Sequence, residues 1–223
     1  MIVKGIVSKF GRLIRIAEKE IIQGIEERRI ETEPSITDRF LGHLEYVINH
    51  SEDVQGIVFR ARTLRDRGIN APESRYGADF CAVLHIRTPE FRQTKGFLSQ
   101  AKIGWNSIRR GARGLVAINF SQNAETGRLN SQIDKMLAIT PDSFVFIYSN
   151  AGFFVIPASS IRGLRSNAEV YGKPVSRFFK EFLMCFIGDH RLSAYDDDTL
   201  EKLRIRTESR TAIIFQVLSR EYL

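Results

Sequence analysis

Three polar residues suited to phosphodiester chemistry lie on two neighbouring strand-like segments of the chain. Asp79 directly precedes the apolar run 80–86, and Gln100 and Lys102 follow in the next run, two residues apart. Residues two apart on a strand point to the same face, so the Gln100 amide and the Lys102 ammonium project together while Ala101 turns into the packing. If the two runs pair as an antiparallel hairpin, Asp79 approaches that polar face.

These residue types are typical of a metal-dependent hydrolytic site. A carboxylate and an amide oxygen can bind Mg²⁺ or Mn²⁺, and an adjacent ammonium can stabilise a hydroxide or a phosphate oxygen. A solvated strand edge is the competing interpretation, because an Asp followed by a two-apart Gln and Lys is a frequent short pattern. The apolar character of both runs favours buried central strands instead, where polar groups are costly unless they are paired or used.

A helix is expected to contribute a further carboxylate. Pro34 fits the first turn of a helix, Glu33 sits beside that turn, and Glu45 lies further along. Apolar residues recur at helical spacing in this segment, at Ile36, Phe40, Leu41, Leu44 and Ile48. A competing role for Glu33 is interaction with the helix dipole. From the residues alone, the acid that completes the site remains open among Glu31, Glu33, Asp38 and Glu45.

The order of these motifs resembles a known family. A helix with a glutamate, a strand with the letters GAD and a strand ending in Q-x-K are similar to the PD-(D/E)xK superfamily of restriction-endonuclease-like nucleases. Within it, the chain is most similar to the branch that includes Mrr-type enzymes, in which Gln replaces the usual acid. The resemblance covers residues 31–157 in motif order and implies a restriction-endonuclease-like fold.

The resemblance also implies a role for each motif residue. Asp79 would be the metal-binding aspartate, Gln100 the variant second ligand and Lys102 the catalytic lysine. Glu33 is favoured as the helix acid, because it stands a few residues before Thr37, as the first acid of the family often does before a Thr. A neutral amide binds a metal less strongly than a carboxylate, so Glu33 should carry more of the charge compensation.

The implied function is that of a Mg²⁺-dependent (or Mn²⁺-dependent) endonuclease that cuts DNA as a prokaryotic defence or restriction-type effector. The replacement of an acid by Gln100 keeps a second interpretation open, a catalytically inactive nucleic-acid-binding or assembly subunit with the same fold. Cleavage of RNA is a third. Cutting both strands of a duplex usually needs two active sites, so a homodimer, a higher oligomer or a defence complex is expected.

The charge of the chain fits a polyanionic partner. Lys and Arg number 33 against 26 Asp and Glu, a net charge of +7. Two basic segments, 60–75 and 105–113, are expected to be loops that contact the DNA backbone, with a solvated surface or an oligomer contact as alternatives. In the helix expected after the Q-x-K strand, Gln132 either contacts phosphate or has no functional role. The resulting candidate contacts are Arg65, Arg67, Arg109, Arg110, Arg113 and Gln132.

The length and composition predict one α/β domain, with a mixed central β-sheet flanked by helices. The chain of 223 residues is 43% hydrophobic, which suffices for one substantial core. The nuclease-like core is expected at about 31–157, followed by a helical and strand extension at 158–223. The N-terminal segment has the pattern of an amphipathic helix that packs on the core or on a second copy.

Other elements follow from local patterns. A helix is expected before a turn at 140–142, followed by a hairpin of two apolar strands that turns at 149–152. Near the C-terminus we expect a helix at about 176–187, with Asp198 capping a later short helix. Both cysteines, Cys81 and Cys185, are interpreted as small buried hydrophobic residues without a disulfide. The absence of a signal-peptide pattern favours a cytoplasmic protein without a membrane segment.

Overall fold

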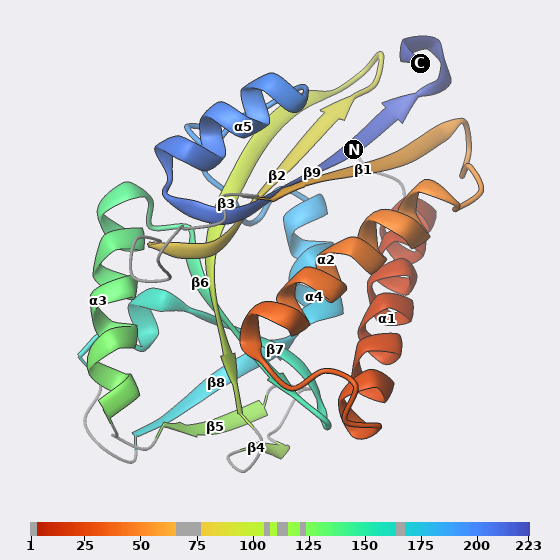
Figure 1. The fold of residues 1–223 in the computed structure, drawn as a ribbon. Helices are drawn as coiled ribbons and strands as arrows, with labels where there is room; N and C mark the ends of the chain where they lie inside the picture. Colours follow the sequence, from red (N-terminus) through yellow and green to blue (C-terminus); the bar gives the residue numbers. More distant parts are fainter. Residues whose placement is uncertain (1–3, 66–76, 105–107, 111–115, 121–123, 164–167) are drawn as a thin grey trace.

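The computed structural model describes residues 4–65, 77–104, 108–110, 116–120, 124–163 and 168–223, with the backbone alone at 108–126 and 168–169 within these ranges. It has three layers, a mixed β-sheet between two groups of helices (Figure 1). The α/β class and the mixed central sheet are therefore confirmed.

The helices differ in length and lie mainly in the two outer layers. The described helices are α1 (Lys4–Glu26), α2 (Glu33–Asn49), α3 (Ala124–Ile139), α4 (Val175–Leu183) and α5 (Asp197–Arg206), with short 3₁₀ turns at η3 (Ala158–Ser160) and η4 (Arg220–Tyr222). The strands are β1 (Ile57–Arg65), β2 (Ala78–Arg87), β3 (Arg92–Ile103), β4 (Ile108–Arg110), β5 (Val116–Phe120), β6 (Ser143–Ser149), β7 (Gly152–Pro157), β8 (Ala168–Pro174) and β9 (Ser209–Ser219).

The strands are not arranged in chain order. Their spatial order is β1-β9-β2-β3-β6-β7-β8-β5-β4. β9 is parallel to β2, and β6 is parallel to β3, whereas the other neighbouring pairs are antiparallel. The expected antiparallel hairpin of β2 and β3 is present, and so is the β6–β7 hairpin with its turn at 149–152.

Each face of the sheet carries its own apolar core. On one face, α1, α2 and α4 bury an aromatic-rich cluster that includes Phe10, Phe97 and Phe179. On the other, α3 and α5 bury a smaller cluster that includes Ile133 and Leu200. The apolar stripe of α1 lies inside the first cluster, so this helix packs on the core of its own chain.

Two segments that we expected to be loops contain strands. β1 continues through residues 60–65, because Phe59 and Ala61 bury one side of the strand while its basic residues stay in solvent, and β9 supplies hydrogen-bonding partners along its length. Residues 108–110 form β4 against β5. The rest of both expected loops, 66–75, 105–107 and 111–113, lies outside the described residues.

The helix expected at about 176–187 is present but shorter, and two other predictions about the C-terminal part, the burial of Cys185 and the cap at Asp198, are wrong. α4 ends at Leu183 because Cys185 adopts a positive φ of 66°, and this turn leaves Cys185 exposed rather than buried. Asp196, not Asp198, caps α5. Its extended backbone lets the carboxylate accept from the Thr199 amide at 2.8 Å, whereas Asp198 lies in the first helical turn.

Candidate functional site

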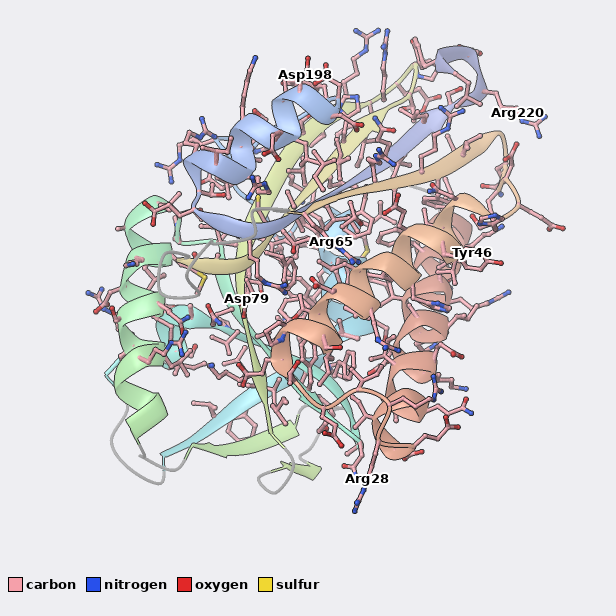
Figure 2. All side chains as sticks on the ribbon, in the orientation of Figure 1. Arg28, Tyr46, Arg65, Asp79, Asp198 and Arg220 are labelled. Carbon is pink, nitrogen blue, oxygen red and sulfur yellow. The ribbon has the colours of Figure 1, made fainter. Side chains whose placement is uncertain are left out.

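The expected pairing of β2 with β3 brings Asp79 against Gln100. Phe80 pairs with Ser99, so the preceding residue of β2 lies beside the following residue of β3. The Asp79 Oδ2 accepts from Gln100 Nε2 at 2.5 Å and from the Ala101 amide at 2.7 Å. Asp79 is half-buried at the start of β2, and its label lies between α3 and α2 in the view of Figure 2.

Helix α2 places Glu33 against the other end of the triplet. Thr32 caps the helix with its side chain, so Glu33 occupies the first turn, followed by Pro34. The Glu33 carboxylate accepts from Lys102 Nζ at 2.9 Å and from the Ile103 amide at 3.1 Å. Gln100 and Lys102 thus each contact one acid of the candidate site.

The other three candidate acids have different surroundings. Glu45 accepts from the Thr63 amide at 3.1 Å, Asp38 forms an ion pair with Arg210 at 3.0 Å, and Glu31 is exposed. Among the four acids that the sequence left open, Glu33 is therefore the one whose side chain meets Lys102.

Burial dominates the electrostatics of Asp79. Desolvation raises the pKa of this carboxyl to about 6, against the opposing effects of the Ala101 amide and of the positive charges of Arg210 and Lys102. The negative charge of Glu33 raises the same pKa further. The two carboxylates are thus close enough to influence each other, although each has its own hydrogen-bond partners.

The buried Gln100 side chain has one acceptor without a donor. Its Nε2 donates to Asp79, but its Oε1 is buried and has no partner within the described part of the chain. An unpaired buried acceptor and a desolvated carboxylate each cost free energy. A divalent cation bound between them would offset both the missing hydrogen bond of Gln100 and the desolvated charge of Asp79. The described residues contain no cluster of three or more His, Cys, Asp or Glu side chains that could hold a metal, so a cation at this point would rely on two acids and one amide.

Tyr148, which the sequence analysis did not select, supports the position of Glu33. It lies on β6, is buried, and its hydroxyl is 3.1 Å from Thr37 Oγ1. Thr37 Oγ1 donates to the Glu33 carbonyl at 3.0 Å, so Tyr148 must be the donor to Thr37. Burial raises the pKa of Tyr148, which keeps this donor protonated. A tyrosine within an otherwise apolar strand was the available sequence signal.

Arg210 is a second residue that the sequence analysis missed. It is the second residue of β9, whose parallel pairing with β2 aligns Ser209 with Ala78 and places Arg210 alongside Asp79. Its guanidinium pairs with Asp38 and donates to the Pro34 carbonyl at 3.3 Å, which ties β9 to the first turn of α2. Only the parallel register of β9, which local patterns do not specify, brings this cation to the site.

The predicted DNA contacts are only partly described. Arg65 is exposed and donates to the Asp38 carbonyl at 2.5 Å, close to α2 (Figure 2). Gln132 is half-buried on α3, and its Oε1 has no partner among the described residues. For Arg109 and Arg110 the structure describes only the backbone, which lies in β4. Arg67 and Arg113 lie outside the described residues. These contacts therefore stay predictions.

Comparison of the chain with protein-family models, with curated proteins and with solved structures gives no match. In the described part of the chain, no helix combines the length and the apolar character needed to cross a membrane. The function is therefore inferred from the geometry and chemistry of this chain's own residues.

Proposed function

We propose that this chain is a Mg²⁺-dependent endonuclease that hydrolyses phosphodiester bonds of DNA, with a restriction-endonuclease-like site. The observation that carries the proposal is the meeting of Asp79 with Gln100, and of Glu33 with Lys102, on adjoining parts of β2, β3 and α2. These side chains come from segments far apart in the sequence and match the acid, amide and ammonium roles expected from the motif order.

Each residue has a chemical role in the proposal. The carboxylates of Asp79 and Glu33 and the free Oε1 of Gln100 would hold Mg²⁺ or Mn²⁺, which supplies charge neutralisation at the scissile phosphate and activation of water. Lys102 stabilises negative charge on the attacking hydroxide or on a phosphate oxygen. Its side chain is 18% exposed and that of Glu33 is 28% exposed, so both groups reach the solvent from which a substrate arrives.

The net charge of +7 supports a nucleic-acid substrate. A role in prokaryotic defence, in the cytoplasm, as a homodimer, a higher oligomer or a subunit of a defence complex, is proposed from the resemblance in motif order.

A second candidate function is a catalytically inactive nucleic-acid-binding or assembly subunit with the same fold. One observation favours it. Both acids of the site already have internal partners, since Asp79 accepts from Gln100 and Ala101, and Glu33 from Lys102 and Ile103. Most polar groups of the site therefore already have hydrogen-bond partners within the protein, and Gln100 Oε1 is the exception.

The test is cleavage of plasmid DNA by the purified chain with Mg²⁺, Mn²⁺ or EDTA, beside the variant Lys102→Met. Removing one charge-stabilising donor typically costs about 100-fold to 1000-fold in rate, and we expect a loss of this size. Lys19→Met is the matched control, because Lys19 is an exposed lysine of α1 outside the site, and its activity should equal that of the wild type.

Three other outcomes would contradict the proposal. Equal cleavage by wild type and Lys102→Met would remove Lys102 from the mechanism. DNA binding without metal-dependent cleavage by the wild type would establish the inactive subunit, and cleavage of RNA alone in a parallel substrate panel would establish a ribonuclease.

A further inference from the structure

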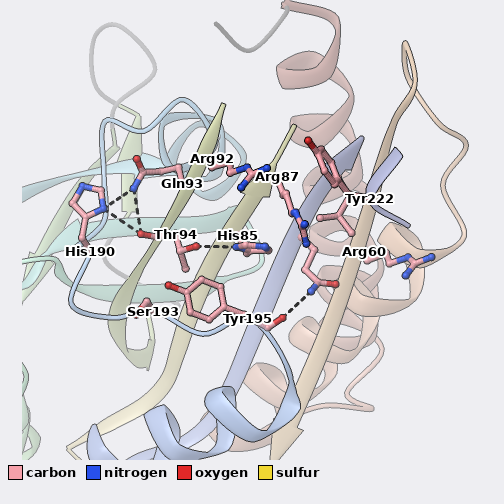
Figure 3. Close-up of a pocket in the computed structure, with 12 residues that line it drawn as sticks. Arg60, His85, Arg87, Arg92, Gln93, Thr94, His190, Ser193, Tyr195 and Tyr222 are labelled. Carbon is pink, nitrogen blue, oxygen red and sulfur yellow. Dashed lines mark hydrogen bonds between the residues drawn. The ribbon is translucent and has the colours of Figure 1, made fainter. Parts of the chain in front are cut away.

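A polar pocket lies on the sheet at the end of β2 opposite to Asp79 (Figure 3). Its volume is about 830 Å³. Side chains from β1, β9, β2 and β3 form its floor, and the segment between α4 and α5 and the C-terminal turn η4 contribute its walls. This volume lies within the range of about 300–1000 Å³ typical of small-molecule sites.

The strand register aligns the floor of the pocket. Arg60 lies opposite Gln216, Gln216 opposite His85, and His85 opposite Thr94, so one row of polar side chains crosses four adjacent strands. A second row contains Leu218, Arg87 and Arg92, which are also paired in register. Because this floor consists of regular strands, the backbone positions from which these side chains project are fixed relative to one another.

The pocket has an excess of positive charge. Arg60, Arg87 and Arg92 line it and are exposed, and the described lining contains no Asp or Glu. With the residues that the structure describes, none of these arginines forms an ion pair. The guanidinium groups of Arg87 and Arg92 lie instead 4.5 and 5.6 Å from the centre of the Tyr222 ring, which restrains them without neutralising them. Such an arrangement favours an anionic ligand with several oxygen atoms.

An aromatic ring lies beside this charge. Tyr195 is 53% exposed, its ring centre is 5.2 Å from that of His85, and its carbonyl accepts from Gln216 Nε2 at 3.2 Å. His85 is itself fixed by a 2.8 Å hydrogen bond to Thr94 Oγ1. The exposed face of a tyrosine held in this way offers a stacking surface for a flat ring.

We propose that this pocket binds a nucleotide, with its phosphates against Arg60, Arg87 and Arg92 and its base against Tyr195. Guanidinium groups recognise phosphate oxygens in bidentate geometry, and an aromatic ring accepts any base by stacking. The walls formed by the segment with Tyr195 and by η4 bound a recess of nucleotide size, which favours a mononucleotide over a nucleic-acid strand.

This site is independent of the proposed nuclease site. Asp79 and Arg87 stand at opposite ends of β2, eight residues apart, which corresponds to about 26 Å along a strand. A nucleotide in the pocket would therefore leave the Lys102–Glu33 contact free. Binding at this pocket can be measured on a protein whose nuclease site is intact or inactivated, so the two proposals fail separately.

The experiment is calorimetric titration of the full chain with ATP, GTP, CTP and UTP. Adenosine, tripolyphosphate and a short single-stranded DNA oligonucleotide are titrated in parallel. We expect at least one nucleoside triphosphate to bind tighter than both tripolyphosphate and adenosine. Arg87→Ala combined with Arg92→Ala should weaken binding at least tenfold, and Tyr195→Leu should weaken it severalfold. Arg12→Ala, at an exposed arginine of α1, is the matched control and should bind as the wild type does.

The proposal is overturned if no nucleoside triphosphate binds at millimolar concentration, or if the arginine and tyrosine variants bind as tightly as the control. Tripolyphosphate binding as tightly as ATP would remove the base from recognition and leave a phosphate site only. Tight binding of the oligonucleotide with none of the mononucleotides would assign the surface to nucleic acid. Circular dichroism of each variant verifies that lost binding does not reflect lost folding.

Discussion

Keeping the Asp79 carboxylate charged in the folded protein lowers the free energy of unfolding. Burial raises its pKa to about 6 from an ordinary value near 3.8, so the folded protein holds the proton more tightly than the unfolded chain does. The native state is therefore favoured at low pH and loses stability as the pH rises through the interval between these two values. A buried carboxyl group with a perturbed pKa is typical of a functional site, where stability is lower than the fold alone would allow.

We predict that Asp79→Asn raises the free energy of unfolding above pH 7. Asparagine keeps an acceptor for the Ala101 amide but carries no charge, and a pKa difference of about two corresponds to roughly 3 kcal/mol as an upper bound. Urea denaturation at pH 8 and at pH 4 measures the effect, which should disappear at pH 4. Asp134→Asn, at an exposed aspartate, should show little change at either pH. A variant that is less stable than the wild type at pH 8 contradicts this interpretation of Asp79.

At the scale of elements, β2 and β3 connect the two polar regions of the molecule. The start of β2 and the end of β3 carry the candidate nuclease residues, while their other ends carry the arginines of the nucleotide pocket. The middle of β3 is held from outside the sheet as well. Gly96 exchanges two backbone hydrogen bonds with Asp189, at 2.8 and 3.0 Å, so the segment after α4 packs directly on the strand.

We predict that Gly96→Ala destabilises the protein by about 2–3 kcal/mol. A Cβ at this position would lie 2.7 Å from the Leu192 carbonyl oxygen and 2.8 Å from that of Ala82. Ala82 lies within β2 and Leu192 is buried in the segment between α4 and α5, so both backbone atoms are held by their surroundings. Thermal unfolding measures the effect. Gly127→Ala in α3 is the control, because nothing lies within 4 Å of the added Cβ, and it should stabilise by about 0.5–1 kcal/mol. Equal unfolding temperatures for the two variants would refute the close packing at Gly96.

At the scale of the whole molecule, local patterns predicted the elements better than their arrangement. The helix with Glu33 in its first turn and the hairpin that joins Asp79 to Gln100 follow from apolar periodicity, turn residues and proline placement, and these are properties of neighbouring residues. The insertion of β9 between β1 and β2 does not follow from such local patterns, because β9 and its neighbours are all apolar runs that could pair in several orders. Arg210 and Tyr148 reach the site through such long-range pairings and were therefore not predicted.

The central claim is that Asp79, Glu33 and Gln100 together bind a divalent cation, and calorimetric titration with Mn²⁺ tests it most directly. We predict one binding event in the wild type, its loss in Asp79→Asn, weakened binding in Glu33→Gln and unchanged binding in Asp134→Asn. An absence of Mn²⁺ binding by the folded wild type, or equal affinity in the wild type and Asp79→Asn, would contradict the metal-dependent site.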